Sequence, residues 1–273
     1  MVASSRRGRR KLKNLSKASV AVIGGSGFEG FLKEVEHVRV GTPYGFPSPV
    51  SIRKFERKTV AFLPRHGLNH TVPPHRINYR ANIFALHILG VKRVFATNAV
   101  GGINRRLKPG DFVVPHDFVD FTKHRKGTFY DDAPVTHVDM SQPYCSEIRS
   151  ALIEAVKHVG ENVWDRAVLA CTEGPRYETP AEVKMLRSFG CDVVGMTGLP
   201  EAVLARELEM CYASLCYVSN MAVGLQKCQT VSELTRIAEK KKLIIEQVLK
   251  EAISSLPKTH GCICARALED AQL

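Results

Sequence analysis

Short apolar runs alternate with stretches of helical periodicity along most of this chain, and this alternation constrains its fold more than any other feature. The first run, 20–23, ends in Gly24-Gly25-Ser26-Gly27. Further runs predict buried strands at 59–63, 93–96, 111–114, 167–171, 192–194 and 213–218. Apolar residues recur at helical spacing in 78–89, 147–158, 180–189, 199–210 and 231–256. Strands that alternate with helices predict an α/β fold, with helices flanking a mixed, largely parallel central sheet.

The chain is expected to form a single domain over residues 18–257, where no repeat, low-complexity block or Pro/Ser-rich linker occurs. Residues 1–17 form a basic tail that is predicted to be disordered. Residues 258–273 form a C-terminal segment. No window approaches the ~18 consecutive apolar residues of a membrane span. Three glycines interrupt the apolar stretch 18–28, which is too short and broken for a signal peptide, so a cytoplasmic protein is expected.

The charge balance points first to a polyanionic partner. Lys and Arg number 39 against 27 Asp and Glu, a formal net charge of +12. Seven of the positive charges lie in residues 1–17, and removing them from +12 leaves an ordinary +5 for the rest. A nucleic-acid-binding protein acting through this tail is therefore one alternative, but no nucleic-acid partner is expected, because the rest of the chain shows no basic stripe interleaved with aromatic residues. This alternative predicts salt-dependent binding that is lost when the tail is deleted.

Eight cysteines are present, but none forms a Cys-x-x-Cys pair or a Cys/His array with zinc spacing. No metal site is therefore expected. A disulfide between Cys262 and Cys264 is one possibility, because intracellular proteins of hyperthermophiles can carry disulfides. Reduced, mostly buried thiols are the other.

Polar and glycine-rich segments follow three of the predicted strands. Ser26 lies in the first glycine turn, Arg65 and His66 follow the strand 59–63, and Asn98 and Ala99 follow the strand 93–96. Backbone N–H groups beside glycines, together with a guanidinium, suit a bound phosphate. A tight turn or a solvated loop would explain each segment taken alone. Neighbouring strand ends meet at one edge of a sheet, so together they predict an anion site.

Three longer motifs carry a resemblance to a known family. They are RHGxxHxxPPHxxNYRANI from Arg65, EGPRYET from Glu173 and GMTxxPEAxLARE from Gly195. Over residues 18–257 the chain resembles the trimeric purine nucleoside phosphorylases, most closely the 5′-methylthioadenosine phosphorylase branch. The resemblance implies the nucleoside phosphorylase fold and cleavage of nucleosides by inorganic phosphate without a metal or organic cofactor. It also implies a homotrimer or homohexamer with active sites completed across subunits.

The resemblance also implies residue roles. The implied phosphate site comprises Ser26, Arg65, His66, Asn98, Ala99 and Thr197. The implied nucleoside site comprises Tyr177, Glu178, Met196, Asn220, Met221, Ala222 and His137. Tyr177 would lie against the purine, Met196 along the sugar, and His137 would reach the 5′ end from a neighbouring subunit. Arg65, His66 and Asn220 are the residues expected to be catalytic.

Specificity is expected to depend on Glu178, Asn220, Ala222 and Glu233. The methylthioadenosine branch usually has Ser in place of Glu178 and a T-D-x-D motif where this chain has Ser219-Asn220-Met221-Ala222. The amide of Asn220 can donate to a 6-oxygen, and Glu178 can accept from the N1–H of hypoxanthine or guanine. Cleavage of inosine and guanosine is therefore predicted.

Three readings stay open beside this prediction. The 5′ pocket, expected around 231–233 and His137, is of mixed polarity, so 5′-methylthioadenosine or 5′-methylthioinosine phosphorylase is the alternative activity. Glu178 could instead be a carboxylate that stabilises the N-terminus of the following helix by interacting with the helix dipole. Asn220 could be a turn residue.

Overall fold

The computed structural model describes residues 17–24, 36–226 and 231–273, with only the backbone of 231–235. Its helices are α2 (Tyr79–Ile88), α3 (Ser146–His158), α4 (Pro180–Ser188), α5 (Glu201–Glu207) and α6 (Val231–Ser255). Three-residue or four-residue 3-10 helices are η2 (Leu68–His70), η3 (Pro74–Arg76) and η4 (Ile263–Arg266). The strands are β1 (Val20–Gly24), β2 (Glu36–Val38), β3 (Val50–Phe55), β4 (Lys58–Pro64), β5 (Arg93–Gly102), β6 (Phe112–Val113), β7 (Asp117–Phe121), β8 (Val163–Trp164), β9 (Val168–Thr172), β10 (Val193–Gly195) and β11 (Cys211–Met221).

The described strands pair into one sheet in the order β2-β3-β4-β1-β5-β10-β9-β7. β11 pairs with both β5 and β6, and β8 pairs with β6. The centre is parallel, because β1 pairs in parallel with β4 and β5, and β5 pairs in parallel with β11. β10 runs antiparallel to β5, whereas β9 runs parallel to β10 and to β7. The prediction of a mixed, largely parallel sheet is confirmed.

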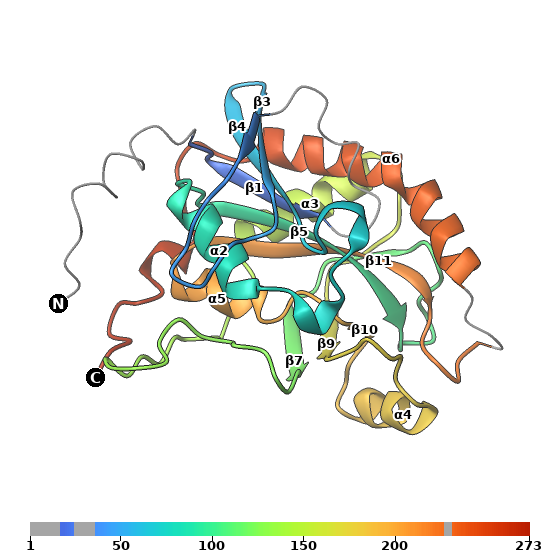
Figure 1. The fold of residues 1–273 in the computed structure, drawn as a ribbon. Coiled ribbons are helices and arrows are strands. Elements are labelled where there is room, and N and C mark those ends of the chain that lie inside the picture. The colour runs from blue at the N-terminus through green and yellow to red at the C-terminus, as the bar shows by residue number, and fades with distance from the viewer. Residues whose placement is uncertain (1–16, 25–35, 227–230) are drawn as a thin grey trace, which may run out of the picture.

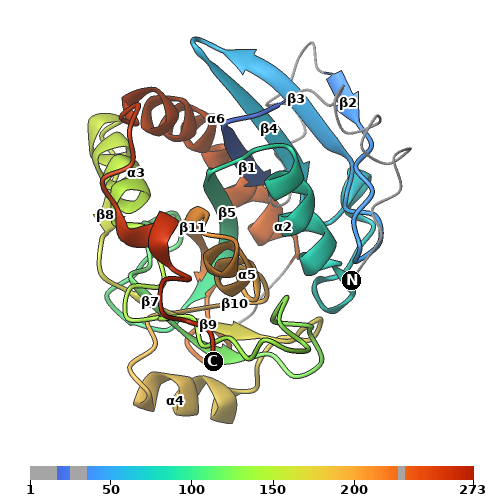
Figure 2. The ribbon, with the colours of Figure 1, turned by 90° about the vertical axis from the view of Figure 1, so that its left-hand side faces the viewer.

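Helices cover both faces of this sheet. α3 and α6 pack together on one face, and α2 and α5 lie on the other (Figure 2). The buried residues of α3 are Ile148, Leu152, Ala155 and Val156, whose spacing places them on one side of the helix. α4 lies apart at the edge of the molecule, beside the ends of β7 and β9 (Figure 1). Buried apolar residues therefore lie on both sides of the sheet.

Three central strands end close together in space. Gly24 at the end of β1 pairs with Pro64 at the end of β4, and the N–H of Arg65 donates to the Gly24 carbonyl at 3.0 Å. β1 pairs with β5 only as far as Ala96, so Asn98 lies just beyond the end of β1. The three strands that precede the predicted anion-binding segments are thus neighbours in the sheet.

Element boundaries differ modestly from the predicted ones. The strand expected at 111–114 spans Phe112–Val113, and the helix expected at 199–210 spans Glu201–Glu207. α4 begins as predicted, with Thr179 and Glu182 forming a reciprocal capping box. The hairpin of β2 and β3 was not predicted, because its residues are partly exposed and lack a clear apolar run.

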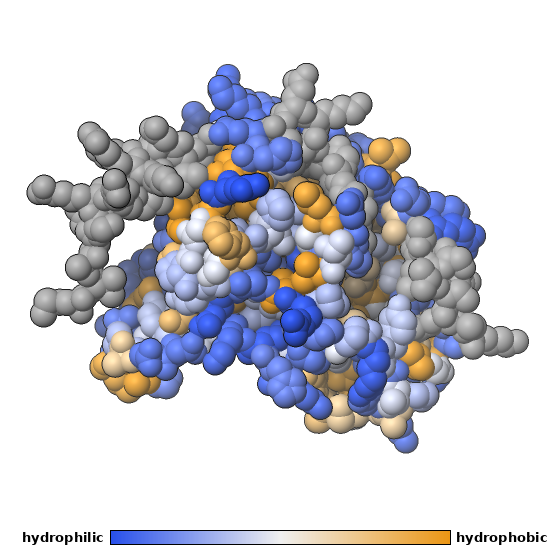
Figure 3. All heavy atoms as spheres, in the orientation of Figure 1, coloured by the Kyte–Doolittle hydropathy of each residue, from blue (hydrophilic) through white to orange (hydrophobic). Residues whose placement is uncertain are grey.

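The surface seen in Figure 3 is mainly hydrophilic, and hydrophobic residues appear on it in separate small groups. No helix within the described ranges has the length and hydropathy that crossing a membrane requires.

Candidate active site

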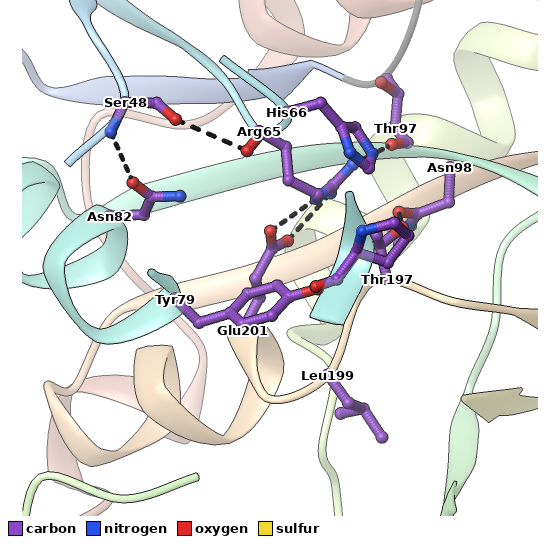
Figure 4. A network of polar contacts seen from close by, with 12 residues as sticks. Ser48, Arg65, His66, Tyr79, Asn82, Thr97, Asn98, Thr197, Leu199 and Glu201 are labelled. Carbon is purple, nitrogen blue, oxygen red and sulfur yellow. Dashed lines mark hydrogen bonds and ion pairs between the residues drawn. The ribbon is translucent and has the colours of Figure 1, made fainter. Parts of the chain in front are cut away.

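Arg65 forms a buried ion pair at the end of β4 (Figure 4). Its Nε donates to Oε1 of Glu201 at 2.6 Å and its Nη2 donates to Oε2 at 2.9 Å, with both side chains almost fully excluded from solvent. Nη1 donates to the Thr97 carbonyl at 2.8 Å. The Tyr212 hydroxyl also donates to Glu201, at 2.8 Å. A guanidinium has five N–H groups. Three of them are used in these contacts, so the described residues leave two N–H groups that can donate to an anion.

Glu201 was not singled out by the sequence analysis, although it lies in the PEA part of the third motif. Burial alone would lower the pKa of Arg65, but the neighbouring Glu201 carboxylate outweighs burial and raises the pKa above its usual value. The guanidinium is therefore permanently charged and fixed in one plane. A bidentate pair of this kind specifies orientation as well as charge.

His66 follows Arg65 and is 9% exposed. Its Nδ1 lies 2.9 Å from the Val72 carbonyl oxygen. A carbonyl can only accept, so Nδ1 holds the proton of the neutral ring and Nε2 presents a lone pair. Burial, and then the charge of Arg65, lowers the pKa of His66 to about 4. The Nδ1 proton is thus used by the Val72 carbonyl, and the neutral ring offers an acceptor at Nε2.

Asn98 joins β5 to two other segments. Its Nδ2 donates to the Ser214 hydroxyl on β11, and its Oδ1 accepts from the Thr197 hydroxyl at 2.8 Å. Ala99 is exposed, whereas residues 93–98 of the same strand are buried. The structure therefore places Asn98, Ala99 and Thr197 together, next to the Thr97 carbonyl that Arg65 contacts.

Glu178 and Tyr177 lie in the loop between β9 and α4. Tyr177 is 47% exposed, whereas Glu178 is 8% exposed. Oε1 of Glu178 accepts from the Thr172 hydroxyl at 2.6 Å. Glu178 and Thr172 both line a cavity of about 340 Å³ between β7, β9 and α4, with Glu173 and Gly174 also in its lining. Glu178 is thus a buried acceptor whose second oxygen receives no hydrogen bond from the described residues.

Asn220 lies near the end of β11 and is 8% exposed. Its Nδ2 donates to the Met221 carbonyl at 2.9 Å, and its Oδ1 accepts from the Ser219 hydroxyl at 2.7 Å. The described residues leave one amide N–H and one lone pair of the amide oxygen without a hydrogen bond. Ala222, two residues further, is buried.

Two glycines allow these segments to approach each other. Gly224 has φ +82°, and a Cβ there would lie 3.3 Å from Cβ of Pro180, the first residue of α4. Gly174 has φ +65°, and a Cβ there would lie 2.6 Å from Sδ of Met196. The structure therefore brings the segments of Glu178 and Asn220 together, and it places Met196 against the loop that carries Tyr177.

Arg125 is a further residue that sequence reasoning missed. Its side chain is 2% exposed and donates to four backbone carbonyls at the ends of β9 and β10 and before α5. They are those of Thr172 at 3.2 Å, Glu173 at 2.9 Å, Met196 at 2.8 Å and Leu199 at 2.5 Å. One cation thus fixes three chain segments around the site. In the sequence, Arg125 lies within the basic run 123–126 and resembles a solvated charge.

The structure does not test the placement of two predicted side chains, and it places a third away from this group. Ser26 lies outside the described residues, and the side chain of Glu233 does too. His137 is exposed, and its N–H donates to the Ala271 carbonyl at 2.7 Å, near the C-terminus. Its contribution to the site of a neighbouring subunit stays a prediction. Among the described residues, the side-chain groups able to hold a metal ion both include Cys262 and contain no residue of this site.

Comparison with known proteins gives a consistent result. A family profile described as the phosphorylase superfamily matches residues 19–254. A probable S-methyl-5′-thioinosine phosphorylase of Methanothermobacter thermautotrophicus is 49% identical over 258 residues, covering 93% of this chain and 90% of the relative. A 6-oxopurine nucleoside phosphorylase of Pyrococcus furiosus is 48% identical and covers 92% and 98%. The crystal structure of a methylthioadenosine phosphorylase from an Antarctic soil metagenomic library superposes with a TM-score of 0.87 at 36% identity, covering 94% and 93%.

Proposed function

The chain belongs to the phosphorylase superfamily, and on this premise we propose that it is a purine nucleoside phosphorylase acting on 6-oxopurine nucleosides. This pentosyltransferase would convert inosine or guanosine and inorganic phosphate into the free base and ribose 1-phosphate, a reaction of purine salvage. The observation that carries the proposal is the pair of buried polar side chains, Glu178 and Asn220, on adjoining segments.

Base recognition follows from the chemistry of this pair. The Glu178 carboxylate accepts from the N1–H of a 6-oxopurine, whereas it would face a lone pair at N1 of adenine. The remaining N–H of Asn220 donates to the 6-oxygen, and its oxygen accepts from the N7–H of the departing base. An unpaired or repelled buried polar group costs about 1–3 kcal/mol, which gives roughly one to two decades of discrimination per site.

Phosphate activation is assigned to the group around Arg65. Phosphate attacks C1′ while the bond from C1′ to N9 breaks, and the transition state resembles a ribosyl oxocarbenium ion between phosphate and base. Fixing the phosphate beside C1′ supplies both the nucleophile and a stabilising negative charge. The two remaining N–H groups of Arg65 hold phosphate oxygens, and Nε2 of neutral His66 accepts from a P–OH group. Ser26, Asn98, Ala99 and Thr197 complete this proposed site.

The reaction involves no redox step and no covalent enzyme intermediate. Phosphate is a co-substrate, and no metal or organic cofactor is proposed for catalysis. We also propose assembly into a trimer or a dimer of trimers, in which His137 reaches the 5′ end of a nucleoside bound by the neighbouring subunit.

A second candidate activity is phosphorolysis of 5′-methylthioinosine or 5′-methylthioadenosine. It is supported by the names of the Methanothermobacter thermautotrophicus relative and of the metagenomic structure. The methylthioinosine form would use the same 6-oxopurine site, and only the 5′ group would differ.

Steady-state phosphorolysis of inosine, guanosine, adenosine, 5′-methylthioadenosine and 5′-methylthioinosine, measured side by side, tests the proposal. We expect kcat/KM to favour the 6-oxopurine member of each matched pair by at least roughly tenfold. A preference for adenosine over inosine, and for methylthioadenosine over methylthioinosine, would refute the assignment of Glu178 and Asn220.

A reciprocal variant sharpens this experiment. Glu178→Ser combined with Asn220→Asp should shift the ratio of kcat/KM toward the 6-aminopurine nucleosides. Glu154→Ser, at an exposed position of α3, serves as the control and should leave the ratio unchanged.

A further inference from the structure

Four cysteine side chains from distant parts of the chain converge at one point. The Sγ atoms of Cys145, Cys211, Cys262 and Cys264 all lie within 4.8 Å of one another. Cys145 is the N-cap residue of α3, Cys211 begins β11, and the other two lie at η4 in the C-terminal segment. Three of the four are buried and Cys262 is partly exposed. We propose that this cysteine cluster binds a single thiophilic divalent cation, zinc, at a structural site.

The spacing of the sulfurs suits one tetrahedral ion. With zinc–sulfur bonds of about 2.3 Å, a tetrahedral site of four thiolates places its sulfurs about 3.8 Å from one another. The Sγ atoms of Cys211 and Cys262 are 3.4 Å apart, and the other separations do not exceed 4.8 Å. Small side-chain rotations therefore suffice to close the site. Two independent disulfides would require only that the sulfurs approach in pairs, whereas here all four surround one point as free thiols.

The surroundings supply the outer contacts that such a centre needs. Four thiolates around a divalent cation carry a net charge of −2, which a nearby cation would offset. Arg206 is 4% exposed, and its Nη1 donates to Sγ of Cys264 at 3.5 Å. Nδ1 of His260 lies 3.5 Å from Sγ of Cys211. Hydrogen bonds to ligand atoms orient the ligands and tune the metal.

Sequence reasoning expected no metal because zinc ligands usually occur in pairs separated by two to four residues. Cys262 and Cys264 are separated by one residue, and the other two are far away in the sequence. Folding alone brings these ligands together, so their spacing in the sequence could not reveal the site.

The ion would fasten the C-terminal segment to the body of the protein. Cys262 and Cys264 belong to this segment, and Cys145 and Cys211 belong to α3 and β11. Beyond the cluster, the segment continues to Ala271, whose carbonyl accepts from His137. Arg206, which touches Cys264, also donates from Nε to the Asp139 carbonyl at 3.2 Å. Metal binding is therefore expected to stabilise residues 137–139 as well.

The test is the metal content of the full chain, purified under anaerobic, reducing conditions without a chelator and loaded with zinc. We expect elemental mass spectrometry to find one zinc ion per chain. Cobalt(II) in place of zinc should show the sulfur-to-cobalt charge-transfer bands and intense d–d bands of a tetrahedral thiolate site. Cys264→Ser should lose stoichiometric metal and the cobalt spectrum. Cys191→Ser removes a buried thiol outside the cluster and should retain both.

If Cys264→Ser fails to fold, the same site can be tested in the wild-type chain. Removing metal with a chelator under reducing conditions should expose the four thiols to a thiol reagent and lower the melting temperature, and zinc should reverse both effects. Substoichiometric zinc in the reduced wild-type chain would refute the site. So would an intact mass showing disulfides among these cysteines after anaerobic preparation. None of these readouts depends on phosphorolysis, so the metal site and the proposed activity can fail separately.

Discussion

At the scale of single residues, the structure defines the protonation and orientation of the groups expected to hold phosphate. Arg65 is held in a plane by Glu201, and His66 is held by Val72. Removing one partner from a buried ion pair typically costs about 3–5 kcal/mol, because the remaining charge is left without compensation. Glu201 is therefore as necessary to the geometry of this site as Arg65.

The buried imidazole of His66 predicts a pH dependence of stability. Its pKa is lowered from 6.5 to about 4. Between these values the unfolded chain binds more protons than the folded one, so the free energy of unfolding rises with pH in this range. The contribution of His66 to the free energy of unfolding is fully present above pH 6.5 and is lost as the pH falls toward 4. A shift of this size corresponds to about 3 kcal/mol.

His66→Asn removes the titrating group and keeps an amide donor for the Val72 carbonyl. Urea unfolding of both proteins from about pH 7 to about pH 4 should show that the wild type loses about 3 kcal/mol more stability than the variant. His87 and His260 also have lowered pKa values, but they are present in both proteins and cancel in the comparison. Parallel stability curves would contradict the buried neutral state of His66.

At the scale of elements, the site depends on how the ends of β9 and β10 are held relative to α5. Arg125 binds carbonyls from all three places and lies over the Tyr79 ring, with its Cζ 5.0 Å from the ring centroid. This arrangement orders the loop that carries the predicted nucleoside residues, whereas the Arg65 pair is formed separately.

Arg125→Lys should therefore affect nucleoside binding more than phosphate binding. An ammonium group cannot reproduce the planar set of donors, and buried carbonyls left unpaired cost about 1–3 kcal/mol each. We expect the KM for inosine to rise roughly tenfold or more, with a smaller change in the KM for phosphate. Arg187→Lys, at an exposed position of α4, is the matched control. An equal rise in both KM values would argue against a role in positioning the nucleoside loop.

At the scale of the whole molecule, the excess of positive charge divides between two regions. Seven of the charges belong to residues 1–17, outside the 19–254 match to the phosphorylase superfamily. The charges of Arg65 and Arg125 in the body are enclosed by carboxylate and carbonyl oxygens. Because seven charges lie within 17 residues and the remaining 256 residues carry a net +5, the tail is the part of the chain expected to attract polyanions.

Replacing residues 1–17 by a single initiating methionine should leave kcat/KM for inosine unchanged. It should also abolish retention on a DNA column at low salt, because multivalent binding to phosphates depends on the number of cationic contacts. Retention that persists after the deletion would place the polyanion-binding surface in the folded body. A large loss of activity would show that the tail contributes to the active site.

The sequence predicted much of the fold and a good part of the candidate site. The alternation of strands and helices and the start of α4 at Pro180 depend on local periodicity and local hydrogen bonds, which neighbouring residues determine. The edge hairpin of β2 and β3 was missed because strands with a partly exposed, polar face lack a strong apolar signal. Arg65, His66, Asn98 and Ala99 could be grouped from the sequence because strand ends gather at one edge of a parallel sheet. Thr197 was implied by the resemblance alone, and phosphate binding by these residues stays a prediction.

The sequence by itself determined the α/β class, the strand-end motifs and the substitutions at Glu178 and Asn220 that indicate a 6-oxopurine. Only the tertiary structure decided which hydrogen-bond and ion-pair partners the buried polar side chains of the site have. Glu201 pairs with Arg65 across 136 positions of the chain, and Cys145 meets Cys264 at the cysteine cluster. Such contacts depend on the packing and register of whole elements. No local pattern records them, so the protonation of His66, the carbonyl contacts of Arg125 and the proposed metal site become visible only in the folded chain.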